Sequence, residues 1–212
     1  MTSSLAETTP AGATNLATPW IVQAGGAQVG VITGLALRLG RPYLCGPAAT
    51  FECCPNDNLG LHAALYRAPR GSVLIGGGGG TEKFGLFGEL MATDAMARGL
   101  GGLVVDGTVR DLADLDRIGF PVICAGAAPA QCTKSAMVAV GRPVTIGGVM
   151  VEPGDQIVGD RDGVVVVPSS LWADVAAAAL AIARREQGYL TRLGRGERIA
   201  DILGLAIAEP GA

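Results

Sequence analysis

Three residues, Glu89, Arg110 and Asp111, have the types and the spacing that chemistry on a small anion would need. Twenty residues separate Glu89 from Arg110, and Asp111 follows directly. The residues between them read as a helix followed by a short apolar strand, a unit that would return the chain to its starting point. A carboxylate beside a cation and a second carboxylate suits a divalent metal ion and an anionic substrate. We therefore expect the chemistry of this chain to be located here.

Each of these residues also has a structural interpretation. Arg110 and Asp111 are expected where a strand ends and a helix begins, the edge at which open α/β sheets collect ligands. At the same place, Asp111 could simply cap the helix while Arg110 pairs with Asp114 on the surface. Glu89 could be a solvated residue in the first turn of its helix. Spacing alone leaves these alternatives open.

Hydrophobic patterns and turn signals predict an α/β core of alternating strands and helices, followed by a run of short strands. The chain is expected to turn sharply at Gly107, and no linker divides it, so one domain is expected. The predicted helices cover residues 20–39, 62–66, 84–98, 111–118 and 171–187, with a short last helix ending at Leu205. The predicted strands cover residues 46–54, 72–75, 103–105, 121–125, 144–146, 149–151, 156–158 and 164–167.

Composition excludes several classes of function. The net charge of −3 and the lack of a basic run give no reason to expect a nucleic acid partner. The most apolar long stretch, 171–183, contains Asp174 and is too short to span a membrane. Residues 1–18 lack an apolar signal core and are interpreted as a flexible arm. The five cysteines are odd in number and lack paired spacing, which favours a reducing cytoplasm.

Metal and cofactor chemistry is also narrowed by residue usage. His62 is the only histidine and there is no Cys-x-x-Cys, so a zinc site is not expected. Carboxylates and water would hold any metal, which favours Mg²⁺ or Mn²⁺. The run Gly76–Gly80 lacks the spacing of a dinucleotide or Walker loop and indicates either a loop near a ligand or a turn. His62 itself could face the site or be structural, and Lys83 and Lys134 are the only candidates for a Schiff base.

Several segments resemble the family of class II 4-hydroxy-4-methyl-2-oxoglutarate/4-carboxy-4-hydroxy-2-oxoadipate aldolases, which also contains the ribonuclease E inhibitor RraA. The most specific likeness is the signature of Glu89, twenty residues, Arg110 and Asp111. The similar segments are residues 55–65, 88–112, 120–126, 142–155 and 160–168. Residues 81–87 and 127–141 differ from the usual pattern, and both stretches could line a pocket, so the substrate could differ as well.

The resemblance implies a single-domain α-β-β-α sandwich over residues 19–212, with a long C-terminal helix and assembly as a homotrimer or homohexamer. Asp111 would hold Mg²⁺ (or Mn²⁺) largely through water, and Arg110 would stabilise a pyruvate enolate. Glu186, from the C-terminal helix of a neighbouring subunit, would reach the metal through water. The residues that would contact the substrate, besides Arg110, are Gly88, Glu89, Leu90 and Met91.

The implied activity is that of a metal-dependent carbon–carbon lyase. It would cleave 4-hydroxy-4-methyl-2-oxoglutarate or 4-carboxy-4-hydroxy-2-oxoadipate to pyruvate, with oxaloacetate decarboxylase side activity through the same enolate. A water positioned by Glu89 would take the proton of the substrate hydroxyl. The alternatives are an RraA-like protein-binding regulator of ribonuclease activity, a family member acting on another 2-oxo acid and, with little support in the sequence, a methyltransferase.

Overall fold

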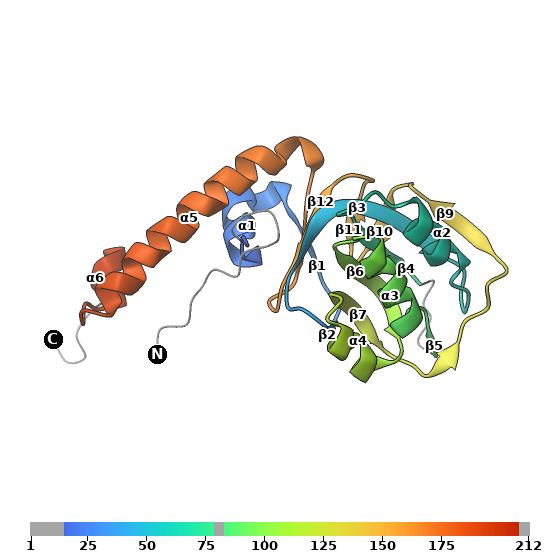
Figure 1. The fold of residues 1–212 in the computed structure, drawn as a ribbon. Coiled ribbons are helices and arrows are strands. Elements are labelled where there is room, and N and C mark those ends of the chain that lie inside the picture. Colours follow the sequence, from blue (N-terminus) through green and yellow to red (C-terminus); the bar gives the residue numbers. More distant parts are fainter. Residues whose placement is uncertain (1–14, 79–82, 208–212) are drawn as a thin grey trace.

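The computed structural model describes residues 15–78 and 83–207, which form a mixed α/β fold around one main sheet (Figure 1). The helices are α1 (Thr18–Gly25), η1 (Gly26–Gln28), α2 (Leu59–Arg67), α3 (Glu89–Ala97), α4 (Leu112–Ile118), η2 (Ser169–Leu171), α5 (Trp172–Leu193) and α6 (Ile199–Leu203). The strands are β1 (Gly30–Ile32), β2 (Leu37–Leu39), β3 (Leu44–Cys53), β4 (Val73–Gly77), β5 (Phe84–Gly85), β6 (Gly102–Val109), β7 (Val122–Ala127), β8 (Ala130–Gln131), β9 (Met137–Val140), β10 (Val144–Ile146), β11 (Val149–Val151), β12 (Gln156–Gly159) and β13 (Val164–Val167). The predicted single-domain α/β class with a long C-terminal helix is confirmed.

The centre of the main sheet is parallel and its flanks are antiparallel. Over the described residues the strand order is β1-β13-β12-β3-β4-β6-β7-β2, with β9 pairing with β3 off this path. Strands β3, β4, β6 and β7 run parallel to one another. Parallel strands are buried on both faces, which explains their continuous apolar runs in the sequence. Their carboxyl ends lie at one edge of the sheet, where Arg110 follows β6.

Different elements cover the two faces of the sheet. Helices α2, α3 and α4 pack on one face, in a core that includes Leu61, Phe87 and Phe120. The antiparallel hairpin β10–β11 covers the other face through Ile146 and Val151. Full burial of each such side chain stabilises the fold by about 1.5–3 kcal/mol. The packing on both faces therefore holds the sheet, and with it the edge that carries the candidate site, in a fixed position.

Helices α1 and α5 form a third cluster with strands β12 and β13. Beyond that cluster, α5 continues to Leu193, past its predicted end at Gln187, and extends away from the sheet with α6 beside its far end (Figure 1). Its buried residues are Val175 and Ala179, both in the half nearest the sheet. No helix in the described part of the chain is long and apolar enough to cross a membrane.

The N-terminal arm predicted over residues 1–18 lies mainly outside the described residues, which begin at 15. At its end, Thr18 opens α1, and its backbone nitrogen and hydroxyl each donate a hydrogen bond of 2.8 Å to the carboxylate of Asp160. The arm over residues 1–14 therefore stays a prediction, whereas Thr18 is fixed to the turn between β12 and β13.

The helix predicted over residues 20–39 is wrong beyond Gly25. The chain forms η1 there and then strands β1 and β2. Gly26 has a φ of 54°, a left-handed conformation that ends the helix. The β-branched residues that follow pair with β13 through Val31 and Ile32.

Two predictions near the site are also wrong. The helix predicted from Phe84 begins only at Glu89, because Phe84 and Gly85 form strand β5 and pair with β8. The turn predicted at Gly107 does not occur, since β6 continues to Val109 with an irregularity in its pairing with β7.

Candidate active site

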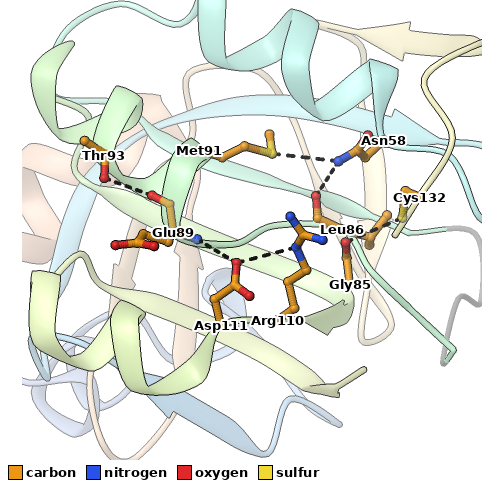
Figure 2. A network of polar contacts seen from close by, with 9 residues as sticks. All are labelled: Asn58, Gly85, Leu86, Glu89, Met91, Thr93, Arg110, Asp111 and Cys132. Carbon is orange, nitrogen blue, oxygen red and sulfur yellow. Dashed lines mark hydrogen bonds and ion pairs between the residues drawn. The ribbon is translucent and has the colours of Figure 1, made fainter. Parts of the chain in front are cut away.

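Asp111 joins the starts of helices α3 and α4. Its Oδ2 accepts a hydrogen bond from the backbone nitrogen of Glu89 at 3.2 Å and lies 3.5 Å from Nε of Arg110 (Figure 2). The Asp111 side chain makes no capping bond to its own helix α4, and instead satisfies the first amide of α3. Asp114, the alternative partner for Arg110, pairs with Arg117 at 3.0 Å. The structure thus brings Glu89, Arg110 and Asp111 together.

The change of direction after β6 falls on Asp111 itself. Its backbone is left-handed, with φ 58° and ψ 44°, a conformation that aspartate tolerates better than most residues. Arg110 is fixed on the other side by its backbone nitrogen, which donates to the carbonyl of Phe87 at 2.9 Å. Such conformations cost free energy and concentrate at functional sites. Both side chains are consequently held against the start of α3.

The Glu89 carboxylate points away from Asp111 (Figure 2). Its Oε1 accepts a hydrogen bond from Nη2 of Arg117 on α4 at 2.7 Å. Only the backbone amide of Glu89 contacts Asp111. The predicted role of the carboxylate in positioning water would require it to leave an exposed ion pair, which costs ~1 kcal/mol or less. That role stays a prediction.

Gly85 and Gly88 allow Arg110 to pack directly on the backbone. A Cβ atom at position 88 would clash with Oδ2 of Asp111 and lie 3.0 Å from Cγ of Arg110. A Cβ atom at position 85 would lie 2.7 Å from Cβ of Arg110. Any side chain at either position would displace the arginine. The predicted contact of Gly88 with substrate is untested, but this glycine is needed for the geometry of the site.

A cavity of about 200 Å³ opens beside Arg110. Two lining residues, Arg110 and the exposed Lys134, are cationic, and no carboxylate is present among the described residues that line it. The Nζ of Lys134 donates to the carbonyl of Cys132 at 3.5 Å. The predicted substrate contacts Leu90 and Met91 belong to this lining, and Leu90 is 78% exposed at its mouth. The lining residues are Asn58, His62, Gly85, Leu86, Phe87, Gly88, Leu90, Met91, Arg110, Gln131, Cys132 and Lys134.

Two buried polar atoms from the start of α2 belong to residues of the cavity wall. Asn58 donates from Nδ2 to the carbonyl of Leu86 at 2.7 Å and contacts Sδ of Met91 at 3.8 Å (Figure 2). Its Oδ1 and the Nε2 of His62, one helical turn later, are buried without a hydrogen-bond partner. Burying a polar atom unpaired costs roughly 1–3 kcal/mol. Both atoms are closed off from solvent in this structure, so a ligand or water would satisfy them only after a shift of the cavity wall.

Burial, more than charge, favours the neutral form of His62. Burial lowers the pKa of the imidazole below its ordinary value, and the positive charge of Lys134 lowers it further. The carboxylates of Asp94 and Asp57 act in the opposite direction with smaller effect. A neutral imidazole can accept a proton from a bound ligand.

Asn58 was not predicted to line a cavity, because the sequence allows it to be interpreted only as a helix cap. Gln131, Cys132 and Lys134 belong to the stretch 127–141, which was expected to be able to line a pocket, and the cavity lining includes all three. Individually, Lys134 was a candidate only for a Schiff base. Gly79 and Gly80 of the glycine run lie outside the described residues.

Glu186 contacts its own chain. Its Oε2 accepts a hydrogen bond of 2.6 Å from Nε1 of Trp20, which ties α5 to α1. The predicted reach of Glu186 into a neighbouring subunit is not tested by this contact.

The residues around Asp111 suit a hard cation held mostly by water. Aspartate and glutamate oxygens are the ligands that Mg²⁺ and Mn²⁺ prefer. The Asp111 side chain is 36% exposed, and only its Oδ2 is engaged in the contacts with Glu89 and Arg110. In the described part of the chain, no three His, Cys, Asp or Glu side chains gather as a metal cage. If a cation binds here, Asp111 is the carboxylate that could hold it, since the Glu89 carboxylate is paired with Arg117.

The fold and the cavity define an α/β protein with a small, mostly apolar pocket at the carboxyl edge of its parallel strands, with Arg110 and Lys134 among the lining residues. The chain belongs to the RraA-like family (Aldolase/RraA), which it matches over residues 19–166. A relative from Halalkalibacterium halodurans, named "Putative 4-hydroxy-4-methyl-2-oxoglutarate aldolase", is 37% identical over 123 residues, or 58% of this chain. The match spans 59% of that relative.

Two solved structures share the fold. One is the S-adenosylmethionine:2-dimethylmenaquinone methyltransferase from Geobacillus kaustophilus, with 31% identity, a TM-score of 0.70, and coverage of 74% of this chain and 98% of that one. The other is the RNA-processing inhibitor RraA from Thermus thermophilis, with 27% identity, a TM-score of 0.67, and coverage of 72% and 92%. The names of these similar proteins give three different functions, namely an aldolase, a methyltransferase and an RNA-processing inhibitor. The geometry of the cavity is therefore needed to choose among them.

Proposed function

We propose that this protein is a divalent-metal-dependent aldolase that cleaves a small 4-hydroxy-2-oxo di- or tricarboxylic acid and releases pyruvate. The observation that carries the proposal is the cavity beside Arg110, which has Arg110 and Lys134 in its wall and no described carboxylate. Two cationic residues in one wall favour a ligand with more than one carboxylate. 4-Hydroxy-4-methyl-2-oxoglutarate has two carboxylates and 4-carboxy-4-hydroxy-2-oxoadipate has three, and the family membership supports both substrates.

In the proposed reaction, the C3–C4 bond breaks as the 4-hydroxyl loses its proton. The bonding electrons move to the C2 oxygen and form a pyruvate enolate, which is then protonated at C3. Arg110 would donate hydrogen bonds to the developing negative charge, an effect worth roughly 3 kcal/mol by comparison with oxyanion sites. The first-turn amides of Leu90 and Met91 lack partners inside α3 and would orient the substrate carboxylate.

Two groups could take the hydroxyl proton. Neutral His62 belongs to the cavity wall and has an unpartnered Nε2. Glu89 could do so through water if its carboxylate leaves Arg117. A divalent cation on Asp111 would supply Lewis-acid stabilisation of the same enolate. Decarboxylation of oxaloacetate passes through this enolate and is proposed as a side activity.

The test is pyruvate release from both 4-hydroxy-2-oxo acids and from oxaloacetate, with Mg²⁺ or Mn²⁺ and with EDTA. We expect release that EDTA abolishes and either metal restores. Folded protein that releases no pyruvate from any of the three compounds with metal present would reject the proposal.

Lys134 in the cavity wall makes a Schiff-base mechanism a specific competitor. The two mechanisms differ in their response to reagents. A Schiff-base aldolase survives EDTA and is trapped by borohydride in the presence of substrate. We expect no such adduct on Lys134, which would be checked by intact-protein mass spectrometry.

The second candidate function is that of a protein-binding regulator, supported by the likeness to RraA. If this candidate is correct, the protein inhibits a ribonuclease, and that inhibition does not depend on the residues of the cavity. Inhibition that persists when Arg110 is changed to Gln, together with absent pyruvate release, would favour this candidate.

A further inference from the structure

Asp57 joins two walls of the cavity through a buried carboxylate that is 2% exposed. Its Oδ2 accepts hydrogen bonds from the Thr133 hydroxyl and the Ser135 amide, both at 2.7 Å. The Ser135 hydroxyl at 3.1 Å and the Ala136 amide at 3.3 Å donate to the same oxygen. Oδ1 accepts from the Leu59 amide at 2.8 Å. One carboxylate thus binds the first amide of α2 to the segment 133–136.

Both of the elements that Asp57 joins carry cavity residues. Helix α2 carries His62, and the segment 133–136 contains Lys134. Backbone hydrogen bonds fix the near end of this segment, since the Thr133 nitrogen donates to the carbonyl of Asn56 at 2.8 Å and the Thr133 carbonyl accepts from the nitrogen of Asn58 at 3.1 Å. On the far side of Lys134, the backbone is held by the amides of Ser135 and Ala136, which donate to Asp57. Without the carboxylate, Lys134 would be fixed on one side only.

The hydrogen bonds around Asp57 favour the ionised carboxylate. Burial alone would raise the pKa of Asp57, but the hydrogen bonds from Ser135, Thr133 and Leu59 outweigh burial and hold the pKa well below its usual range. Hydrogen bonds to an ionised acceptor are roughly twice as strong as neutral ones. The carboxylate is therefore an anchor that an amide cannot replace, because an amide has one acceptor oxygen instead of two.

We propose that Asp57 is a positioning residue that holds segment 133–136 so that Lys134 stands in the cavity and meets the second carboxylate of the substrate. The identity of that ligand rests on the proposed function. The placement of Lys134 by Asp57 does not, and it can be tested without any activity.

The test uses the single histidine as a reporter. NMR titration gives the pKa of His62 in the wild type, Lys134→Met, Asp57→Asn and the double variant. Removing the positive charge of Lys134 should raise the His62 pKa by roughly a few tenths of a unit or more in the wild-type background. The direct effect of the Asp57 charge on the His62 pKa is the same with Lys134 and with Lys134→Met. It therefore cancels when the shift caused by Lys134→Met is compared between the wild-type and Asp57→Asn backgrounds.

We expect Lys134→Met to shift the His62 pKa by less than half as much in the Asp57→Asn background, because Lys134 will have moved away. Equal shifts in both backgrounds would overturn the proposal. So would an unchanged pKa in Lys134→Met alone, since Lys134 would then not stand beside the cavity.

Asp155→Asn is the matched control. Asp155 is also buried and also anchors backbone, accepting from the amides of Glu152 at 2.9 Å and Ser169 at 3.1 Å, but it lies outside the cavity wall. In the Asp155→Asn background, Lys134→Met should shift the His62 pKa by as much as it does in the wild type. If Asp57→Asn does not fold, Thr133→Val removes one donor to Asp57 at nearly constant side-chain shape, and the same cycle applies.

Kinetics provide the second readout. In Asp57→Asn, the KM for 4-hydroxy-4-methyl-2-oxoglutarate should rise about tenfold or more, as in Lys134→Met, with a smaller change in kcat, and the double variant should be no worse than Lys134→Met. Additive losses would assign Asp57 a merely structural role. If the wild type itself releases no pyruvate while the NMR cycle gives the expected result, the proposed function fails and the positioning stands.

Discussion

The carboxylate of Asp111 caps a helix to which it does not belong: its Oδ2 lies 3.2 Å from the backbone nitrogen of Glu89, the first residue of α3. A residue at the start of one helix thereby sets the position of another. The same oxygen is 3.5 Å from Nε of Arg110, so the cap and the cation are coupled. Changes at Asp111 should consequently affect both the geometry and the charge of the site.

Asp111→Asn separates charge from conformation. Asparagine tolerates the left-handed backbone and can still accept from Glu89, so the stability loss should stay within about 1 kcal/mol. Loss of the anionic ligand should lower pyruvate release by ~100-fold or more, since even indirect metal partners are worth 10–100-fold. The measurements are steady-state kinetics and thermal unfolding. Asp114→Asn on the same helix, whose exposed partner is Arg117, is the control and should retain activity. Equal activity in the two variants would remove Asp111 from the mechanism.

Gly88→Ala should disable the site without unfolding the protein. The added methyl group must displace Asp111 Oδ2 and the Arg110 side chain. Misplacing a catalytic group by about 1 Å can cost 100-fold in rate, and we expect a loss of that order in kcat. Gly163→Ala is the control, because a Cβ there meets no atom within 4 Å. Wild-type kcat in Gly88→Ala would mean that the close packing of Arg110 is not needed.

His62 should make the protein less stable in mild acid. Burial, and secondarily Lys134, lowers its pKa in the folded state, so between that lowered value and about 6.5 the unfolded chain binds more protons. Stability is therefore lost as the pH falls through this window. His62→Gln should show a smaller drop in melting temperature between pH ~7.5 and ~5.5 than the wild type. Parallel drops in the two proteins would contradict the lowered pKa.

Variants of Glu186 and Trp20 test whether Glu186 contributes to the active site of a neighbouring subunit. Glu186→Gln and Trp20→Phe both weaken the contact of 2.6 Å between α5 and α1. If Glu186 also reaches a neighbouring site, kcat should fall in Glu186→Gln but not in Trp20→Phe, while the melting temperatures change alike. The same kcat in both variants would restrict Glu186 to its own chain.

The sequence was most informative where spacing alone determines contact. The helix and strand between Glu89 and Arg110 return the chain to its start, so their juxtaposition could be predicted. The contact made by Glu89 could not, because the direction of its carboxylate depends on Arg117, which lies on the next helix. The extension of β6 past Gly107 was missed for a similar reason, since pairing with β7 overrides the local turn preference of glycine. The stretch 127–141 could be expected near a pocket, but the place of Lys134 within it could not be predicted, because contacts with Asp57, 77 positions earlier, hold its segment.

The long helix α5 also affects how the protein will behave in solution. At 1.5 Å per residue, its 22 residues measure roughly 33 Å, and its second half stands clear of the sheet (Figure 1). A molecule with such a projection has a larger frictional coefficient than a sphere of the same mass. A single subunit of 21.4 kDa should therefore elute early from a sizing column. Its assembly state is better measured by light scattering or sedimentation equilibrium, which report mass independently of outline.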